Sequence, residues 1–289
     1  MFKDLIDLIN VLSRRDFANA SNDLIEYVNN AKDFADILEQ IGTIPESIKH
    51  DSTEEKLFAK ASDAVLARAF RELGLKATVI KERGDSADVA IESSLYGYAA
   101  VADAKAFRMS RTAKNQKDFK IAALSSWKQD ADYAILCAPY FQYPRFQSQI
   151  YSQSIDYNVC LFSWEHLIFM ISKGIKESLK VKLSDFWNFG EIYSHRVLAF
   201  ERKKYFMDKF NESITNALQI DKNIFADFLK SYINKISERS VVEKTYWKEV
   251  KSDIQNYSKE KAIKELLKAM KIDEKIFQID AYVEGARYD

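Results

Sequence analysis

Residues 99–120 of the chain read AAVADAKAFRMSRTAKNQKDFK, and residues 84–91, a short way before them, read GDSADVAI. Each stretch contains a short apolar run of the length of a strand. Asp103 and Lys105 are two residues apart, so they project from the same face of a strand. The loop between the two runs is short, which predicts an antiparallel pair that brings Asp88 towards Asp103.

The pattern around this pair predicts a helix-rich α/β protein with a mixed central sheet. Strands are predicted at five short apolar runs, namely 77–80, 88–91, 98–104, 133–138 and 159–162. A helix is predicted over 112–128. We expect a single domain over 1–289, with a helical N-terminal part at 1–73, a sheet core at 74–165 and a helical C-terminal part at 166–289. Ser52 and Thr53 before two glutamates predict a helix start.

Composition excludes several classes of protein. The formal net charge is zero, which excludes a bulk polycation but allows a local basic groove. Cys137 and Cys160 each lie in an apolar stretch and are expected to be buried thiols. With three histidines in the chain, a zinc site is not expected. The N-terminus lacks the apolar run of a signal peptide, and nothing approaches a membrane span. We therefore expect a cytoplasmic protein.

Asp88, Asp103 and Lys105 are the candidates for chemistry. Two close carboxylates repel each other unless a cation lies between them, and Mg²⁺ prefers such oxygen ligands. Lys105 would then lower the pKa of an attacking water, orient it, or stabilise charge on phosphoryl oxygens. The same parts form the D…(D/E)-x-K motif of many nucleases. The motif alone also fits an Asp that caps a turn beside a surface Asp–Lys pair.

A basic segment follows the motif. Residues 105–120 hold six lysines and arginines against one acid, together with hydroxyl and amide side chains. Such side chains suit the phosphate backbone and the base edges of DNA. The alternative interpretation is a solvated helix face.

Six stretches carry a resemblance to a known family. They are VADAKAFRMSRTAKNQKDFK at 101–120, STEEKLF at 52–58, ERG at 82–84, FQYP at 141–144, LFSWEHL at 161–167 and ISERS at 236–240. They closely resemble, in the same order, stretches of the HindIII-type restriction endonucleases, which belong to the D…(D/E)-x-K nuclease superfamily. The resemblance covers most of the chain and is weaker near 190–204 and at the C-terminus.

The resemblance implies a homodimeric type II restriction endonuclease that uses Mg²⁺. It implies cleavage of double-stranded DNA at the palindrome AAGCTT after the first A, which leaves 5′-phosphate ends, and pairing with a cognate DNA methyltransferase. A palindrome suits a two-fold dimer in which each subunit reads one half-site. The alternatives are a repair or junction-resolving nuclease of the same fold and a non-catalytic DNA-binding relative.

The family's catalytic residues fall on Asp88, Asp103 and Lys105, with the two aspartates as metal ligands. Glu55 is a candidate for the additional acid that related nucleases carry on a helix before the sheet. Its alternative role is that of a first-turn acid favoured by the helix dipole. The candidates for DNA contact are Arg108, Arg111, Lys114, Asn115, Lys117, Asp118 and Lys120.

Overall fold

A computed structural model of the chain describes residues 2–81, 86–111, 116–144, 148–196 and 205–285, with backbone alone for Gln116 and 282–285. The chain divides into two compact units, residues 1–237 and 238–289. The single domain expected over 1–289 stays a prediction.

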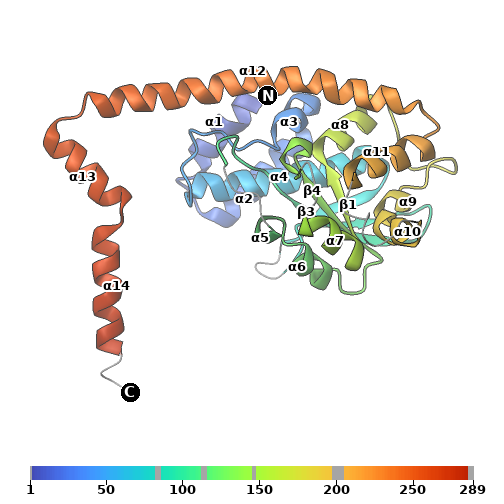
Figure 1. The fold of residues 1–289 in the computed structure, drawn as a ribbon, viewed down its shortest axis with the longest axis horizontal. Helices are drawn as coiled ribbons and strands as arrows, with labels where there is room; N and C mark the ends of the chain where they lie inside the picture. Colours follow the sequence, from blue (N-terminus) through green and yellow to red (C-terminus); the bar gives the residue numbers. More distant parts are fainter. Residues whose placement is uncertain (1, 82–85, 112–115, 145–147, 197–204, 286–289) are drawn as a thin grey trace. The chain divides into compact units, whose positions relative to one another are not determined.

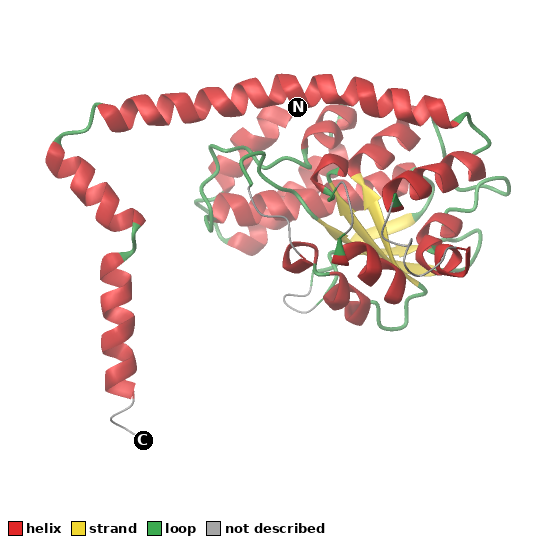
Figure 2. Ribbon diagram, in the orientation of Figure 1, coloured by secondary structure: helices red, strands yellow, loops and turns green. Residues whose placement is uncertain are grey.

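A five-stranded mixed sheet forms the centre of the first unit (Figure 2). The strand order is β1-β2-β3-β4-β5, with antiparallel pairing up to β3 and parallel pairing from β3 to β5. The strands are β1 (Lys76–Val79), β2 (Val89–Glu92), β3 (Ala99–Ala104), β4 (Tyr133–Ala138) and β5 (Val159–Ser163). All five predicted strands are confirmed to within a residue or so. Every residue of β5 is buried, as expected for a parallel strand covered on both faces.

Helices surround this sheet (Figure 1). Those before β4 are α1 (Phe2–Leu12), α2 (Phe17–Asn30), α3 (Phe34–Gln40), α4 (Thr53–Glu72), α5 (Gln116–Phe119) and α6 (Ile121–Trp127). Those after β4 are the 3-10 turn η1 (Tyr140–Gln142), α7 (Gln149–Asp156), α8 (Trp164–Ser172), α9 (Ser184–Trp187), α10 (Phe189–Arg196) and α11 (Phe206–Ala217). Helix α4 packs against β1, β2 and β3, while α6 packs against β3, β4 and β5. The fold is the predicted helix-rich α/β arrangement.

Helix α4 begins where the capping signal predicts. The Ser52 hydroxyl accepts a hydrogen bond from the backbone N–H of Glu55 at 3.1 Å, which satisfies one free donor of the first turn. The helix then runs for 20 residues and buries one face against the sheet. It therefore fixes where any side chain on that face meets the strands.

The prediction of one continuous helix over 112–128 is wrong. Residues 112–115 lie outside the described residues, and the rest forms α5 and α6, separated by Lys120 in the left-handed region at φ 48°. Phe119 and Ile121 are both buried. Two residues two apart point to opposite sides of a continuous helix, so the break lets both reach the core.

In its described part, the second unit consists of helices joined by short connections. Helix α12 (Lys222–Gln255) starts in the first unit and ends in the second, and α13 (Lys259–Ala269) and α14 (Ile272–Gly285) follow. The predicted helical character of this part of the chain is confirmed. Among the described residues, no helix is both long enough and apolar enough to span a membrane.

Candidate active site

Asp103 and Lys105 lie at the C-terminal end of β3. Asp103 is 3% exposed and opposes Leu136 in the parallel pairing with β4. Lys105 follows the strand directly, and its backbone N–H donates to the Cys137 carbonyl at 2.8 Å, which extends the ladder by one bond. The Lys105 ammonium forms an ion pair with Asp103 Oδ2. The two side chains therefore meet on one face, as the spacing predicts.

Asp88 stands opposite Asp103. The antiparallel register pairs Val89 with Ala102, so the next position towards the strand end sets Asp88 across from Asp103. The Asp88 N–H donates to the Ala102 carbonyl at 3.0 Å, and its Oδ2 accepts from the Ala104 N–H at 2.9 Å. Burial raises the pKa of Asp88 well above its usual value, and the charges of Asp63 and Asp103 raise it further.

Asp63 is a third carboxylate at this place, and the sequence reasoning missed it. It lies on the sheet-facing side of α4, is 3% exposed and accepts a hydrogen bond from Lys60 Nζ at 2.8 Å. Burial raises its pKa to about 6, against the opposing effect of Lys60, and Asp103 adds to the rise. The available signal was an Asp inside the apolar helical stretch 61–67, where a charge is costly unless it is paired or used.

Glu55 is not brought together with these residues. It lies in the first turn of α4, eight residues before Asp63, which is about 12 Å along a helix axis. Its Oε1 pairs with Arg108, and its Oε2 contacts His50 Nδ1 at 3.0 Å and the Asp51 N–H at 2.7 Å. Burial alone would raise the pKa of Glu55, but these hydrogen bonds outweigh it and the pKa lies below its usual value.

The segment after the lysine is anchored by its backbone. The Lys105 carbonyl accepts from the Trp164 indole at 2.9 Å, and the Phe107 N–H donates to the Gly42 carbonyl at 3.1 Å. Gly42 fits closely here, because a Cβ at this position would lie 2.7 Å from the Trp164 ring. The anchoring fixes the direction in which the chain leaves β3.

A buried glutamate, Glu46, also holds this segment. Its two oxygens accept from the Ser110 N–H at 2.9 Å and from the Ser110 hydroxyl at 2.8 Å, and Glu46 is 4% exposed. Arg108 donates to the Ile48 carbonyl at 2.7 Å in addition to its pairing with Glu55. The loop before α4 thus fastens the first part of the basic segment through contacts across more than 50 residues of chain.

The structure separates the candidates for DNA contact into three groups. Arg108 is engaged as described, and Arg111 pairs with Asp118 and stacks over the Phe107 ring, 3.8 Å from its centroid. Lys117 and Lys120 are exposed. Lys114 and Asn115 lie outside the described residues. In this structure, three of the seven candidates are therefore engaged in contacts within the protein.

Asp63, Asp88 and Asp103 are oxygen donors of the kind that a hard divalent cation takes, but their oxygens do not all lie within 4.8 Å of one another. Among the described residues, that closeness is met by the ligand atoms of His50, Asp51 and Glu55. Asp103 and Asp63 are buried. Asp103 Oδ2 has no hydrogen bond of acceptable geometry among the described residues, and its contact is the ion pair with Lys105. The raised pKa values of Asp63 and Asp88 mean that, without a cation, the cluster resists carrying all its charges. Mg²⁺ takes oxygen ligands of this kind.

The raised pKa of Asp88 predicts how metal-free stability depends on pH. The pKa of Asp88 in the folded protein lies above its unfolded value of about 4. The contribution of protonated Asp88 to the free energy of unfolding is therefore fully present below about pH 4 and is lost as the pH rises through the folded pKa. We expect Asp88→Asn in EDTA to have a higher free energy of unfolding than the parent protein at pH 8, with the difference vanishing near pH 4. Urea denaturation at both pH values measures this. Equal pH slopes for the two proteins would contradict the prediction, and Asp132→Asn at the other end of β3 is the matched control.

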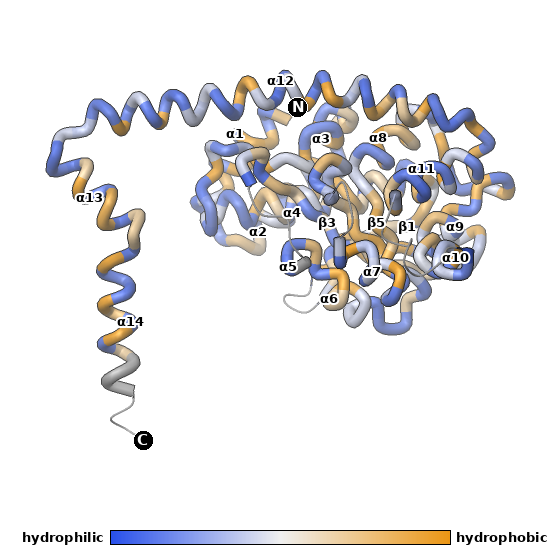
Figure 3. The backbone as a smooth tube through the Cα atoms, in the orientation of Figure 1, coloured by the Kyte–Doolittle hydropathy of each residue, from blue (hydrophilic) through white to orange (hydrophobic). Residues whose placement is uncertain are grey.

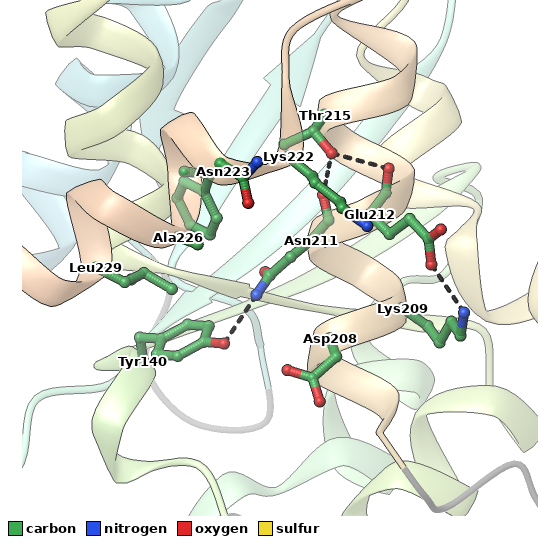
Figure 4. A pocket seen from close by; sticks show the side chains of 11 residues that line it. Tyr140, Asp208, Lys209, Asn211, Glu212, Thr215, Lys222, Asn223, Ala226 and Leu229 are labelled. Carbon is green, nitrogen blue, oxygen red and sulfur yellow. Dashed lines mark hydrogen bonds and ion pairs between the residues drawn. The ribbon is translucent and has the colours of Figure 1, made fainter.

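A separate pocket of about 480 Å³ lies between η1, α11 and the start of α12. Asn211 spans it, donating to the Tyr140 hydroxyl at 2.8 Å (Figure 4) and contacting the buried His166 Nε2 at 2.9 Å through its Oδ1. Burial lowers the pKa of His166 to about 4, so the ring is neutral near pH 7. None of the lining residues belongs to the carboxylate cluster. The pocket takes no part in the chemistry proposed below.

Comparison with known proteins identifies the family. The family model described as HindIII restriction endonuclease matches residues 4–282. The type II restriction enzyme HindIII of Haemophilus influenzae is 43% identical over 285 residues, which cover 98% of this chain and 95% of that enzyme. A solved structure of the restriction endonuclease FokI is 14% identical, with a TM-score of 0.38, over 61% of this chain and 34% of that one. The sequence matches over nearly the whole length, together with the mixed sheet, place the chain in the HindIII restriction endonuclease family of type II restriction enzymes.

Proposed function

We propose that the protein cleaves double-stranded DNA at AAGCTT after the first A in a Mg²⁺-dependent reaction that leaves 5′-phosphate ends. The proposal rests above all on the meeting of Asp88, Asp103 and Lys105 at the ends of two paired strands. The choice of site rests on the 43% identity to HindIII and is the finer part of the proposal. We further propose a homodimer that works in the cytoplasm beside a cognate methyltransferase.

The side chains divide the chemistry among themselves. Asp88 and Asp103 would hold the ion, and Asp63 adds negative charge next to them. A bound Mg²⁺ supplies charge stabilisation for phosphoryl oxygens and activation of water. Lys105, held by its own backbone bonds, orients the attacking water and stabilises the negative charge that develops on the scissile phosphate. In this proposal, Glu55 positions Arg108 and takes no part in the reaction.

Exposed residues of the basic segment are the proposed DNA contacts. Lys117 and Lys120 are exposed residues, and lysine side chains suit phosphates or guanine edges. Asn115 and Lys114 stay candidates for base contact, with Asn suited to adenine. Arg111 and Asp118, which pair with each other, are proposed to shape the segment.

Digestion of a mapped plasmid tests the function and the site together. With Mg²⁺ we expect a fixed set of fragments whose ends, once sequenced, lie after the first A of AAGCTT, and no fragments in EDTA. The matched substrate is the same plasmid with every AAGCTT changed at one base. Fragments from the changed plasmid would overturn the site, whereas cutting only at four-way junctions would favour the repair or junction-resolving alternative.

The contacts of Glu46 predict that its removal weakens DNA binding more than it slows cleavage. Glu46→Ala removes the acceptor of two hydrogen bonds and leaves the Ser110 N–H without it, a cost of about 1–3 kcal/mol. We expect affinity for an AAGCTT duplex to fall about tenfold or more, because the basic segment loses its anchor. The single-turnover rate at saturating enzyme should change little. Glu46→Gln and Ser110→Ala each keep part of the contact, so their affinities for the duplex should lie between those of the parent protein and Glu46→Ala. An equal loss in cleavage rate and in affinity would contradict the positioning role of Glu46.

A further inference from the structure

Exposed apolar side chains gather in the second unit. Of the 18 large hydrophobic side chains that are exposed among the described residues, 11 lie in 238–289. The other seven are scattered over the first unit, in α1, loops, the end of α7 and the start of α12. Single exposed apolar residues are ordinary on a protein surface, but a concentration of this kind marks an interaction surface.

On α13 and α14 these side chains form stripes. Along α13 and its end the stripe is Ile263, Leu266, Leu267 and Met270, at the spacing of one helix face. Along α14 it includes Ile276 and Ile279. Figure 3 shows apolar and polar residues alternating along both helices in this manner. A stripe of this width is typical of a helix that packs against a partner.

The second unit has no apolar core of its own. None of its described apolar side chains is buried, and α13 has no buried residue at all. Helices of 11 and 14 residues are marginal in water without packing. Helices α13 and α14 therefore need a covering surface that is itself apolar and continuous.

The net charges of α13 and α14 indicate which surface covers these helices. Helix α13 carries four lysines against two glutamates, whereas α14 carries four acidic residues against one lysine. At about 100° of rotation per residue, Lys264 and Glu260 lie on one flank of the α13 stripe, and Asp273 and Asp280 lie on the corresponding flank of the α14 stripe, so the opposition of charge is one of net charge between the two helices. Antiparallel packing brings these flanks together. Each helix thus fits the other in both its apolar stripe and its charge, as the flanking positions of coiled coils do.

We propose that α13 and α14 form a docking surface for a second copy of this chain, with α13 of each copy packed antiparallel against α14 of the other. A two-fold axis makes both contacts equivalent, because residue i meets residue j and j meets i. The second copy supplies an exposed apolar face and a helix of opposite net charge at each contact. This inference rests on the homodimer of the proposed function and assigns the surface that forms it.

Charge reversal on full-length protein tests the pairing. One variant reverses α13 (Lys264→Glu with Lys268→Glu), a second reverses α14 (Asp273→Lys with Asp280→Lys), and a third carries all four changes. Sedimentation equilibrium at low salt measures the dimer dissociation constant of each. The control variant is Lys173→Glu with Lys180→Glu, which makes the same charge change as the α13 variant at exposed residues of the first unit.

We expect each single-helix variant alone to dimerise at least tenfold more weakly than the parent, because both contacts become like-charged. The equimolar mixture of the two, and the four-change variant, should recover dimer affinity, because each contact again joins opposite charges. Recovery also shows that the variants fold.

Four outcomes would overturn the inference. Parent-like dimers from both single-helix variants would place the interface elsewhere and leave the proposed homodimer intact. Weakening without recovery in the mixture would mean that α13 packs on α14 of its own chain. Unchanged dimers with reduced affinity for DNA would make this surface a DNA contact. A parent protein that is monomeric throughout would overturn the homodimer as well, whereas plasmid cleavage, measured in parallel, reports on the nuclease proposal alone.

Discussion

Asp103→Asn is expected to abolish cleavage while specific DNA binding survives. The amide keeps the shape of the buried side chain but loses the charge that would hold the ion at the end of β3. Loss of metal-based charge stabilisation is worth several kcal/mol, or a rate reduction of about 1,000-fold or more. Single-turnover cleavage in Mg²⁺ and duplex binding in Ca²⁺ measure the two quantities separately.

Asp132→Asn is the matched control for this change. Asp132 lies beside the opposite end of the same strand, where its Oδ2 accepts from the Ala99 N–H at 2.9 Å. The same chemical change is made on the same strand pair, away from the carboxylate cluster. We expect near-parental cleavage from it. If Asp103→Asn cut as fast as Asp132→Asn, the assignment of Asp103 as a metal ligand would fail.

The sheet was predictable because its signals are local. The runs that became β2 and β3 are short and apolar and are separated by a short connection, so their lengths and antiparallel pairing follow from the chain alone. The same register sets Asp88 opposite Asp103, and alternation sets Lys105 beside Asp103. These three residues could therefore be predicted together from two strands.

The features of the site that could not be predicted from the sequence depend on contacts between distant segments of the chain. Asp63 reaches the cluster because α4 packs on the strands, and the place where the helix crosses the sheet decides that Asp63, rather than Glu55, lies beside Asp88 and Asp103. Sequence reasoning placed an acid on the right helix but chose the first turn. Asp63 was the better signal, because it lies inside the apolar stretch 61–67, and an unpaired charge on the buried face of a helix is costly.

The basic segment shows a similar limit. Counting charges treats Arg108 and Arg111 as free to contact DNA, yet Arg108 pairs with Glu55, 53 residues away in the chain, and Arg111 pairs with Asp118. Composition cannot distinguish a cation that shapes a loop from one that faces a ligand. That distinction requires the position of the partner carboxylate, which only the fold supplies.

Lys105→Ala is expected to leave a folded protein that binds its site but cuts about 100-fold more slowly or worse, as is typical when one placed charge stabiliser is lost. The backbone bonds of residue 105 to Cys137 and Trp164 do not involve the side chain, so the segment should keep its course. Lys105 also lowers the pKa of Asp88, so its loss adds to the repulsion among the carboxylates. We therefore expect reduced metal-free stability, which Mg²⁺ restores by binding the folded state.

Two further variants separate catalysis from structure at this lysine. Lys105→Arg keeps the charge, so it should recover the stability of the metal-free protein while recovering less of the rate, because a planar guanidinium does not match an ammonium in position. Lys60→Ala removes the other lysine of the cluster, which pairs with Asp63, and should lower stability with a smaller effect on the rate. Thermal unfolding in EDTA and in Mg²⁺, with single-turnover cleavage, gives both quantities for each variant. A Lys105→Ala protein that is unfolded even in Mg²⁺ would make the ion pair with Asp103 structural, and one that cuts at the parental rate would remove Lys105 from the reaction.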